Sequence, residues 1–175
     1  MRIQEVIEVL NAMQSDGVID SYAIGGAVGA TFYLEPLATV DVDVFLDLAP
    51  AEGRQIVDPQ PVFSYLSSRG CQMEGEYVII GGWPVRFLPP CGPLVEEALA
   101  QALVADVEGR PARVFSAEHL AAIALQTGRG KDKARLLQFL ESRSLDMPKY
   151  MDIVTRHGLT AAWEKFSHDF LEETQ

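Results

Sequence analysis

Apolar and polar residues follow patterns along the chain that predict a mixture of helices and strands. In residues 3–13 the apolar side chains recur with the period of a helix, which predicts one buried helical face. Residues 39–48 alternate strictly between polar and apolar positions, as in a strand that is buried on one side. Shorter segments predict a strand over 21–24 and helices over 27–34, 62–68, 94–100 and 131–140.

Turn residues predict where these elements end. Pro36 would end the helix over 27–34, and a Pro/Gly-rich loop is expected over 49–61. Ser116 is a typical N-cap for the helix that follows it. Two hairpins are predicted, one joining 77–80 to 83–88 through Gly81-Gly82 and one joining 104–107 to 112–115 through 108–111.

The C-terminal part of the chain is predicted to be mainly helical. Pro148 suits a first helical turn and Gly158 a helix end. Trp163, Phe166 and Phe170 recur on one helical face beyond them. Without an internal repeat or a low-complexity tract, residues 1–175 are expected to form one α/β (α+β) domain with a helical extension over about 141–175.

The composition limits the partners that the protein is expected to bind and the cellular compartment in which it is expected. The 175 residues include 25 acidic and 14 basic side chains, which gives a net charge of −11. General nucleic-acid binding is not expected, because basic side chains supply most of the affinity for phosphate backbones. No run of about 18 apolar residues predicts a membrane span. Two isolated cysteines, Cys71 and Cys91, and an N-terminal segment interrupted by acidic residues predict a cytoplasmic protein with reduced thiols.

The candidate chemistry begins with Asp41-Val42-Asp43-Val44 in the alternating segment. Alternation places Asp41 and Asp43 on the same strand face, about 6.6 Å apart along the strand. Two such carboxylates can reach one or two divalent cations, and Mg²⁺ commonly uses one or two carboxylates together with substrate phosphates. The alternative is a solvated strand face without a ligand.

A second signal lies upstream, where the strand over 21–24 runs into Gly25-Gly26. Glycines between a strand and a helix let backbone N–H groups approach phosphates. A tight turn without a ligand is the alternative for the glycines alone. A phosphate-binding turn and a metal-binding strand together predict a nucleotide site.

This combination resembles the DNA polymerase β-like nucleotidyltransferase superfamily. The superfamily pattern is an apolar residue, Gly, and Gly or Ser, then a spacer and Asp-apolar-Asp/Glu-apolar. The chain has Ile24-Gly25-Gly26, a slightly long spacer of 14 residues over 27–40, and Asp41-Val42-Asp43-Val44. Arg129-Gly130-Lys131-Asp132-Lys133, which precedes an apolar helix, is similar to a segment of AbiEii-type toxin-related nucleotidyltransferases. The likeness covers about residues 20–140 and implies a mixed sheet flanked by helices.

The resemblance implies transfer of NMP from an NTP substrate to a hydroxyl group, with two Mg²⁺ ions. Asp41 and Asp43 would bind the metal, and Gly25 and Gly26 would hold the triphosphate. Arg129 or Lys131 would meet the triphosphate charge, and Asp132 would orient that lysine. The alternative for the charged run over 129–135 is a solvated helix start.

One residue departs from the superfamily pattern. Active members usually supply a third carboxylate from a neighbouring strand, and the matching segment here carries Arg86. An arginine stays protonated and cannot act as a base. Either Glu74 or Glu76 substitutes for the missing carboxylate, or Arg86 pairs with Asp41 or Asp43 and occupies the metal position with a fixed cation.

Three hypotheses follow from these residues. The first is an active nucleotidyltransferase, and Asp41 and Asp43 favour it. The second is a catalytically reduced member that binds a nucleotide or a protein partner, for instance within a toxin–antitoxin pair. The third is a domain that serves only as an interaction surface. Arg86 favours the second and third.

Overall fold

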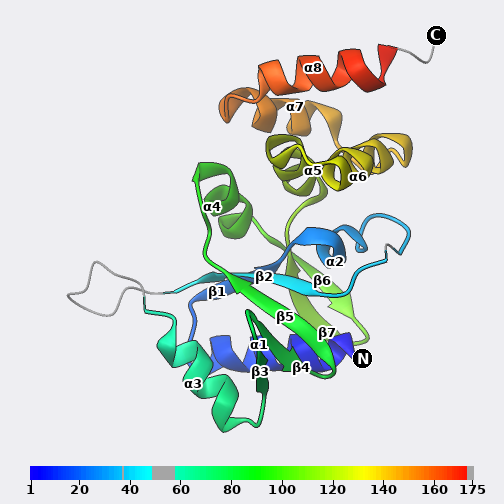
Figure 1. The fold of residues 1–175 in the computed structure, drawn as a ribbon. Helices are drawn as coiled ribbons and strands as arrows, with labels where there is room; N and C mark the ends of the chain where they lie inside the picture. The colour runs from blue at the N-terminus through cyan, green and yellow to red at the C-terminus, as the bar shows by residue number, and fades with distance from the viewer. Residues whose placement is uncertain (37, 49–57, 173–175) are drawn as a thin grey trace.

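A mixed β-sheet lies at the centre of the molecule (Figure 1). The computed structural model describes residues 1–36, 38–48 and 58–172, so most of the loop predicted over 49–61 lies outside the described residues. Within them the sheet has seven strands in the order β3-β4-β5-β2-β1-β7-β6. β1 and β2 are antiparallel, while β2 with β5 and β1 with β7 are parallel. The strands are β1 (Ser21–Ile24), β2 (Val42–Asp47), β3 (Gln72–Glu74), β4 (Tyr77–Ile80), β5 (Trp83–Leu88), β6 (Leu103–Val107) and β7 (Arg110–Val114).

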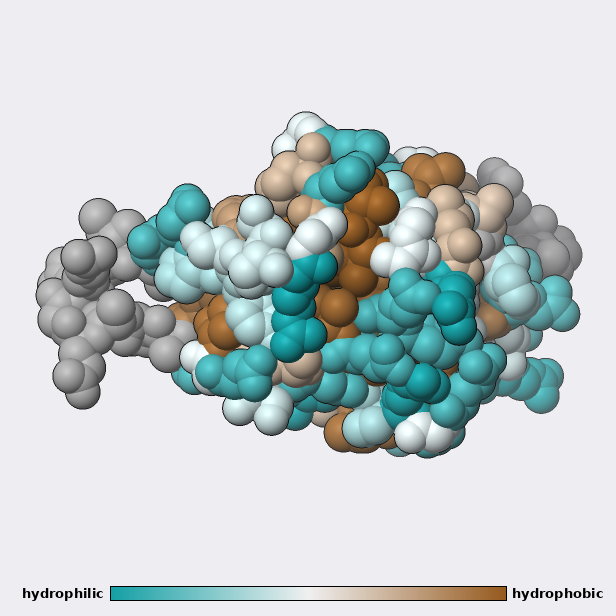
Figure 2. Space-filling view, turned by 90° about the horizontal axis from the view of Figure 1, so that it is seen from below, coloured by the Kyte–Doolittle hydropathy of each residue, from teal (hydrophilic) through white to brown (hydrophobic). Residues whose placement is uncertain are grey.

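Helices cover both faces of this sheet. α1 (Ile3–Ser15) and α3 (Gln60–Ser68) lie on one face, where α1 buries the apolar positions expected from its sequence period. Seen from this side, the surface is largely hydrophilic and is interrupted by a narrow hydrophobic band (Figure 2). The opposite face carries α2 (Gly26–Ala30), α4 (Pro93–Ala100), α5 (Ala117–Thr127), α6 (Gly130–Glu141), α7 (Met147–Arg156) and α8 (Thr160–Phe170).

The alternation along β2 divides its side chains between these two layers. Val42, Val44 and Leu46 are buried in the core beneath α1. Phe45 packs in the other core, beneath α5, and Asp43 lies on that same face. The polar face of the predicted strand therefore points toward the C-terminal helices.

Most of the predicted elements are present, with four differences. The predicted helix over 27–34 stops at Ala30, where the Thr31 hydroxyl donates to the Val28 carbonyl and the chain continues as turns. β2 begins at Val42, so Asp41 precedes the strand. β3 was not predicted, because its three exposed residues carry no apolar pattern. The β6–β7 turn is Glu108-Gly109, since both residues have positive φ, and Arg110 already belongs to β7.

A polar cluster around Glu97 joins α4 to the C-terminal helices. The Glu97 carboxylate accepts hydrogen bonds from both terminal nitrogens of Arg156, at 2.8 and 2.9 Å, and lies 2.7 Å from Nε2 of His157. His119 Nε2 lies 3.1 Å from the same carboxylate, and His119 Nδ1 lies 2.7 Å from Oγ of Ser116, the N-cap of α5. One carboxylate thus connects α4, α5 and α7.

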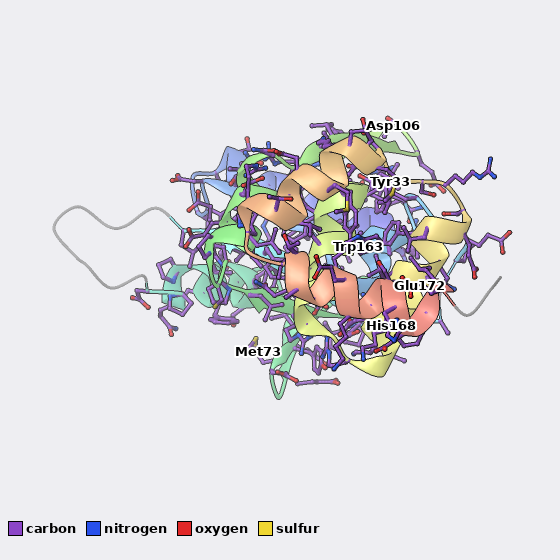
Figure 3. All side chains as sticks on the ribbon, turned by 90° about the horizontal axis from the view of Figure 1, so that it is seen from above. Tyr33, Met73, Asp106, Trp163, His168 and Glu172 are labelled. Carbon is purple, nitrogen blue, oxygen red and sulfur yellow. The ribbon has the colours of Figure 1, made fainter. Side chains whose placement is uncertain are left out.

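Aromatic packing completes the helical layer beyond this cluster. α8 lies across the top of the layer, with Trp163 and His168 along it (Figure 3). Trp163 meets the buried ring of Tyr150 edge to face at a centroid distance of 5.4 Å and stacks near Phe166. None of the helices in the described ranges is long and apolar enough to cross a membrane.

The Glu97 cluster predicts that stability falls on acidification. Hydrogen bonds from Arg156, followed by those from the histidines, hold the pKa of Glu97 well below its usual 4.5. Because the folded pKa is lower than the unfolded one, the contribution is complete above about pH 4.5 and is lost as the pH falls toward the folded value. Burial also lowers the pKa of His119 from its usual 6.5. Below pH 6.5 the unfolded state therefore binds a proton more readily than the folded state, and stability falls further on acidification.

We therefore expect Glu97→Gln to lower the free energy of unfolding at neutral pH by about 1–2 kcal/mol and to flatten its acid dependence. Urea denaturation at several pH values measures both effects. The control is Glu96→Gln, an exposed neighbour on the same helix. A Glu97→Gln profile parallel to that of the wild type would contradict the prediction.

Candidate functional site

A pocket of about 710 Å³ lies between the polar face of the sheet and the helices α5 and α6. It brings together seven of the eight residues predicted for the site, although they come from positions more than 100 residues apart. These are Gly26, Asp41, Asp43, Arg86, Arg129, Lys131 and Asp132. Gly25 does not line the pocket; its N–H donates to the Asp43 carbonyl at 3.0 Å, and the rings of Phe45 and Phe115 pack against it.

The Gly25-Gly26 turn lies directly against Asp43. Gly26 has φ +58°, and a Cβ atom built there would be 2.4 Å from Oδ2 of Asp43. Only glycine permits this close approach in this backbone conformation. The helix that follows, α2, has five residues, so its dipole is small. Phosphate binding here would depend on side chains more than on the helix start that the sequence suggested.

Arg86 occupies the position beside the two carboxylates. The parallel pairing of β2 and β5 sets Asp43 in register with Arg86. The Arg86 guanidinium donates from Nε to Oδ1 of Asp43 at 2.9 Å, and its Nη2 lies 2.8 Å from the same oxygen. Of the two aspartates that the sequence left open as partners of Arg86, Asp43 is the one that pairs with it. This hydrogen bond raises the pKa of Arg86 above its usual value.

The neighbouring groups on the β4–β5 side do not supply a third carboxylate to the pocket. Asp41 accepts a hydrogen bond from the Tyr77 hydroxyl at 3.3 Å. The exposed Glu76 lies 4.0 Å from Nη1 of Arg86, so it faces the guanidinium rather than the metal position. Glu74 is exposed on β3, which is separated from β2 by β4 and β5. The proposed substitution by Glu74 or Glu76 finds no support in this arrangement.

The start of α6 supplies basic groups to the opposite wall. Asp132 is buried and pairs with Arg129 at 2.6 Å and with Arg135 at 4.0 Å. The predicted orientation of Lys131 by Asp132 is therefore wrong, because the carboxylate turns toward the two arginines. The alternative of a solvated helix start fits the exposed Arg129 and Lys131, but not the buried Asp132.

Arg135 is a site residue that sequence reasoning did not single out. Its side chain lines the pocket, and burial lowers its pKa. Nε of Arg135 is buried and has no hydrogen-bond partner among the described residues. An unsatisfied buried donor costs free energy unless a ligand or water meets it. The signal that could have found it is its spacing, one helical turn after Asp132.

The charges make the pocket suited to an anion. Within the described lining, Arg86, Arg129, Lys131 and Arg135 outnumber the acidic Asp41, Asp43 and Asp132, although the whole chain is strongly acidic. An apolar wall adjoins them, where the rings of Phe45 and Phe115 lie 4.9 Å apart between centroids. The pocket thus combines several basic side chains with an apolar surface.

The residues do not fit a resident pair of divalent metal ions. The described ranges contain no group of three His, Cys, Asp or Glu side chains placed to hold a metal. Of the two carboxylates in the pocket, Asp43 is already neutralised by Arg86. A two-metal site depends on several anionic oxygens around both cations.

The fold is shared with nucleotidyltransferases of known structure. The crystal structure of ANT(2'')-Ia in complex with adenylyl-2''-tobramycin matches with a TM-score of 0.53 and 17% identity, over 92% of this chain and 97% of that one. An antigenic nucleotidyltransferase-like protein from Paracoccidioides brasiliensis matches with a TM-score of 0.55 and 16% identity, over 92% and 93%. Comparison of the sequence with protein-family models and with curated proteins finds no match.

At these identities the likeness shows the fold alone. The predicted nucleotidyltransferase-like architecture, a mixed sheet flanked by helices, is confirmed. The narrower resemblance to AbiEii-type proteins stays a prediction, as do the roles of the individual site residues.

The contact between Gly26 and Asp43 predicts an unusually costly glycine substitution. Gly26→Ala combines a strained backbone with a clash against the Asp43 carboxylate, so we expect a loss of about 2–4 kcal/mol in the free energy of unfolding. Gly75→Ala is the matched control, because Gly75 has a similar φ of +63° and open space around a Cβ. We expect about 1 kcal/mol there. Equal losses in thermal or urea unfolding would show that the Asp43 contact has no effect.

Proposed function

We propose that this protein binds a nucleoside triphosphate in the pocket between β2 and α6. The observation that carries the proposal is Arg135, whose side chain lines the same pocket as Lys131 and Arg129 and whose buried Nε lacks a partner in the described structure. Phosphate oxygens are strong acceptors for such guanidinium donors. The triphosphate would lie among these basic groups.

The apolar wall supports the same ligand. Phe45 and Phe115 form one side of the wall, and Leu120 and Ile123 of α5 form another. Ligand pockets of this size commonly pair an apolar surface with a few polar groups that orient the ligand. A nucleobase or ribose would pack there, with the phosphates directed toward α6. The nucleotidyltransferase fold of the chain adds to this support.

Calorimetry with ATP, GTP, CTP and UTP tests the proposal. We expect at least one nucleotide to bind, and Arg135→Gln to weaken that binding about 10- to 100-fold, because a hydrogen bond to a charged group is lost. Lys133→Gln is the matched control, because this substitution removes the same charge from the same helix. The Lys133 side chain lies over the Phe170 ring and is not part of the pocket lining.

Two results would contradict nucleotide binding at this site. One is the absence of heat and of any thermal stabilisation with all four nucleotides. The other is an equal loss in Arg135→Gln and Lys133→Gln, which would indicate a diffuse charge effect.

A second candidate function is Mg²⁺-dependent transfer of NMP to a hydroxyl acceptor. It is favoured by the position of Asp43, whose Oδ2 faces Gly26 while Arg86 binds Oδ1. Asp41 lines the same pocket, and the two carboxylates are the groups that would carry this chemistry. The candidate requires Arg86 to leave Asp43. A partner-binding role, for instance within a toxin–antitoxin pair, stays a further prediction from the sequence resemblance.

Transfer of label to the acceptor from nucleotides labelled at the α-phosphate, together with release of unlabelled pyrophosphate, tests the transfer candidate. Tobramycin is one acceptor to include, because its adenylyl derivative is bound in the ANT(2'')-Ia structure and a cation suits an acidic chain. Transfer predicts release that requires Mg²⁺ and falls about 100-fold or more in Asp41→Asn. A nucleotide that binds without any release of pyrophosphate would remove this candidate and leave binding in place.

A further inference from the structure

The ion pair between Arg86 and Asp43 is built into the sheet. β2 and β5 are neighbouring parallel strands, and their register places the two residues side by side on the pocket face. The Nε hydrogen bond, at 2.9 Å, and the Nη2 ion-pair contact, at 2.8 Å, meet at one oxygen. Both side chains are partly buried, with 19% of Asp43 and 32% of Arg86 exposed. Such a pair is less screened by solvent than an ion pair on the open surface.

Arg86 has donors to spare for a ligand. A guanidinium carries five N–H groups and stays charged at any physiological pH. Nε donates to Asp43 and Nη2 lies 2.8 Å from the same oxygen, while Nη1 is 4.0 Å from the exposed Glu76, beyond hydrogen-bond distance. A phosphate oxygen at the pocket surface of Arg86 would therefore meet a cation that is already held in place.

The numbers of basic and acidic side chains in the pocket lining show what Arg86 contributes. With Arg86 the pocket lining has four basic and three acidic side chains in its described part. Without Arg86 the two kinds would be equal in number, and Asp41 and Asp43 would repel a triphosphate unless a metal ion screened them. In many phosphate sites a bound Mg²⁺ provides that screening.

We propose, on the basis of the nucleotide-binding function above, that Arg86 takes the place of a divalent cation at Asp43, so that the pocket binds a nucleoside triphosphate without Mg²⁺. Arg86 neutralises Asp43 on one side and meets the phosphates on the other. The same guanidinium competes with any divalent ion for the Asp43 carboxylate. Arg86 thus determines which form of the nucleotide the site accepts.

Calorimetry in EDTA and in MgCl₂ tests this, with the nucleotide among ATP, GTP, CTP and UTP that binds most tightly as the probe. We expect wild-type affinity in EDTA to be at least equal to that in MgCl₂. Arg86→Gln should lose about 10- to 100-fold in EDTA and regain affinity in MgCl₂, because the freed carboxylates can then share a metal ion with the phosphates.

Asp43→Asn provides a second, opposite test. It should bind the metal-free nucleotide more tightly than the wild type, because it removes a negative charge and frees Arg86 donors. A site that depends on metal would lose binding instead. Arg69→Gln is the matched control for charge, since Arg69 pairs with Asp16 and stacks on Tyr65 away from the pocket. Thermal unfolding of each variant confirms that it is folded.

The possible outcomes separate the role of Arg86 from nucleotide binding itself. Wild-type binding that requires MgCl₂, or a loss of binding in Asp43→Asn, overturns the role of Arg86 and leaves nucleotide binding standing. The absence of binding in both buffers overturns nucleotide binding and this inference with it. Metal-free binding that Arg86→Gln does not weaken also overturns the role of Arg86.

Discussion

The parallel pairing of β2 with β5 is the constraint on which the site depends. It sets Asp43 beside Arg86, and the resulting ion pair neutralises a carboxylate that the glycine turn at Gly26 approaches closely. Because the pair is partly buried, the charge of one member strongly affects the other. The balance of basic and acidic side chains in the described pocket lining depends on this one contact.

The C-terminal helices provide the other half of the pocket. α5 packs on the sheet and against α6 and α7, while Glu97 joins α4 to His119 and Arg156. This layer carries the basic start of α6 across the polar face of β2. An acidic chain thereby gathers an excess of basic side chains in the described lining of one pocket.

Much of the fold could be predicted from local patterns. The strict alternation around Val42 and Val44 indicated which face of β2 is buried, and Ser116 indicated the start of α5. Less could be predicted of the site. The sequence placed Arg86 in the same site as Asp41 and Asp43, but it left open which of the two carboxylates binds the arginine. It also predicted that Asp132 orients Lys131. Those choices depend on strand register and helix packing, which a single sequence does not show.

The sequence by itself determined the kinds of most elements, their order and the presence of a glycine turn before two aspartates at the start of a strand. These properties are local, because side-chain period and backbone conformation involve residues close in the chain. Tertiary structure alone decided that Arg86 binds Asp43, that Asp132 turns to two arginines and that the buried Nε of Arg135 has no partner within the described part of the chain. Ion pairs and burial act over a few ångströms in space, whatever the distance along the chain.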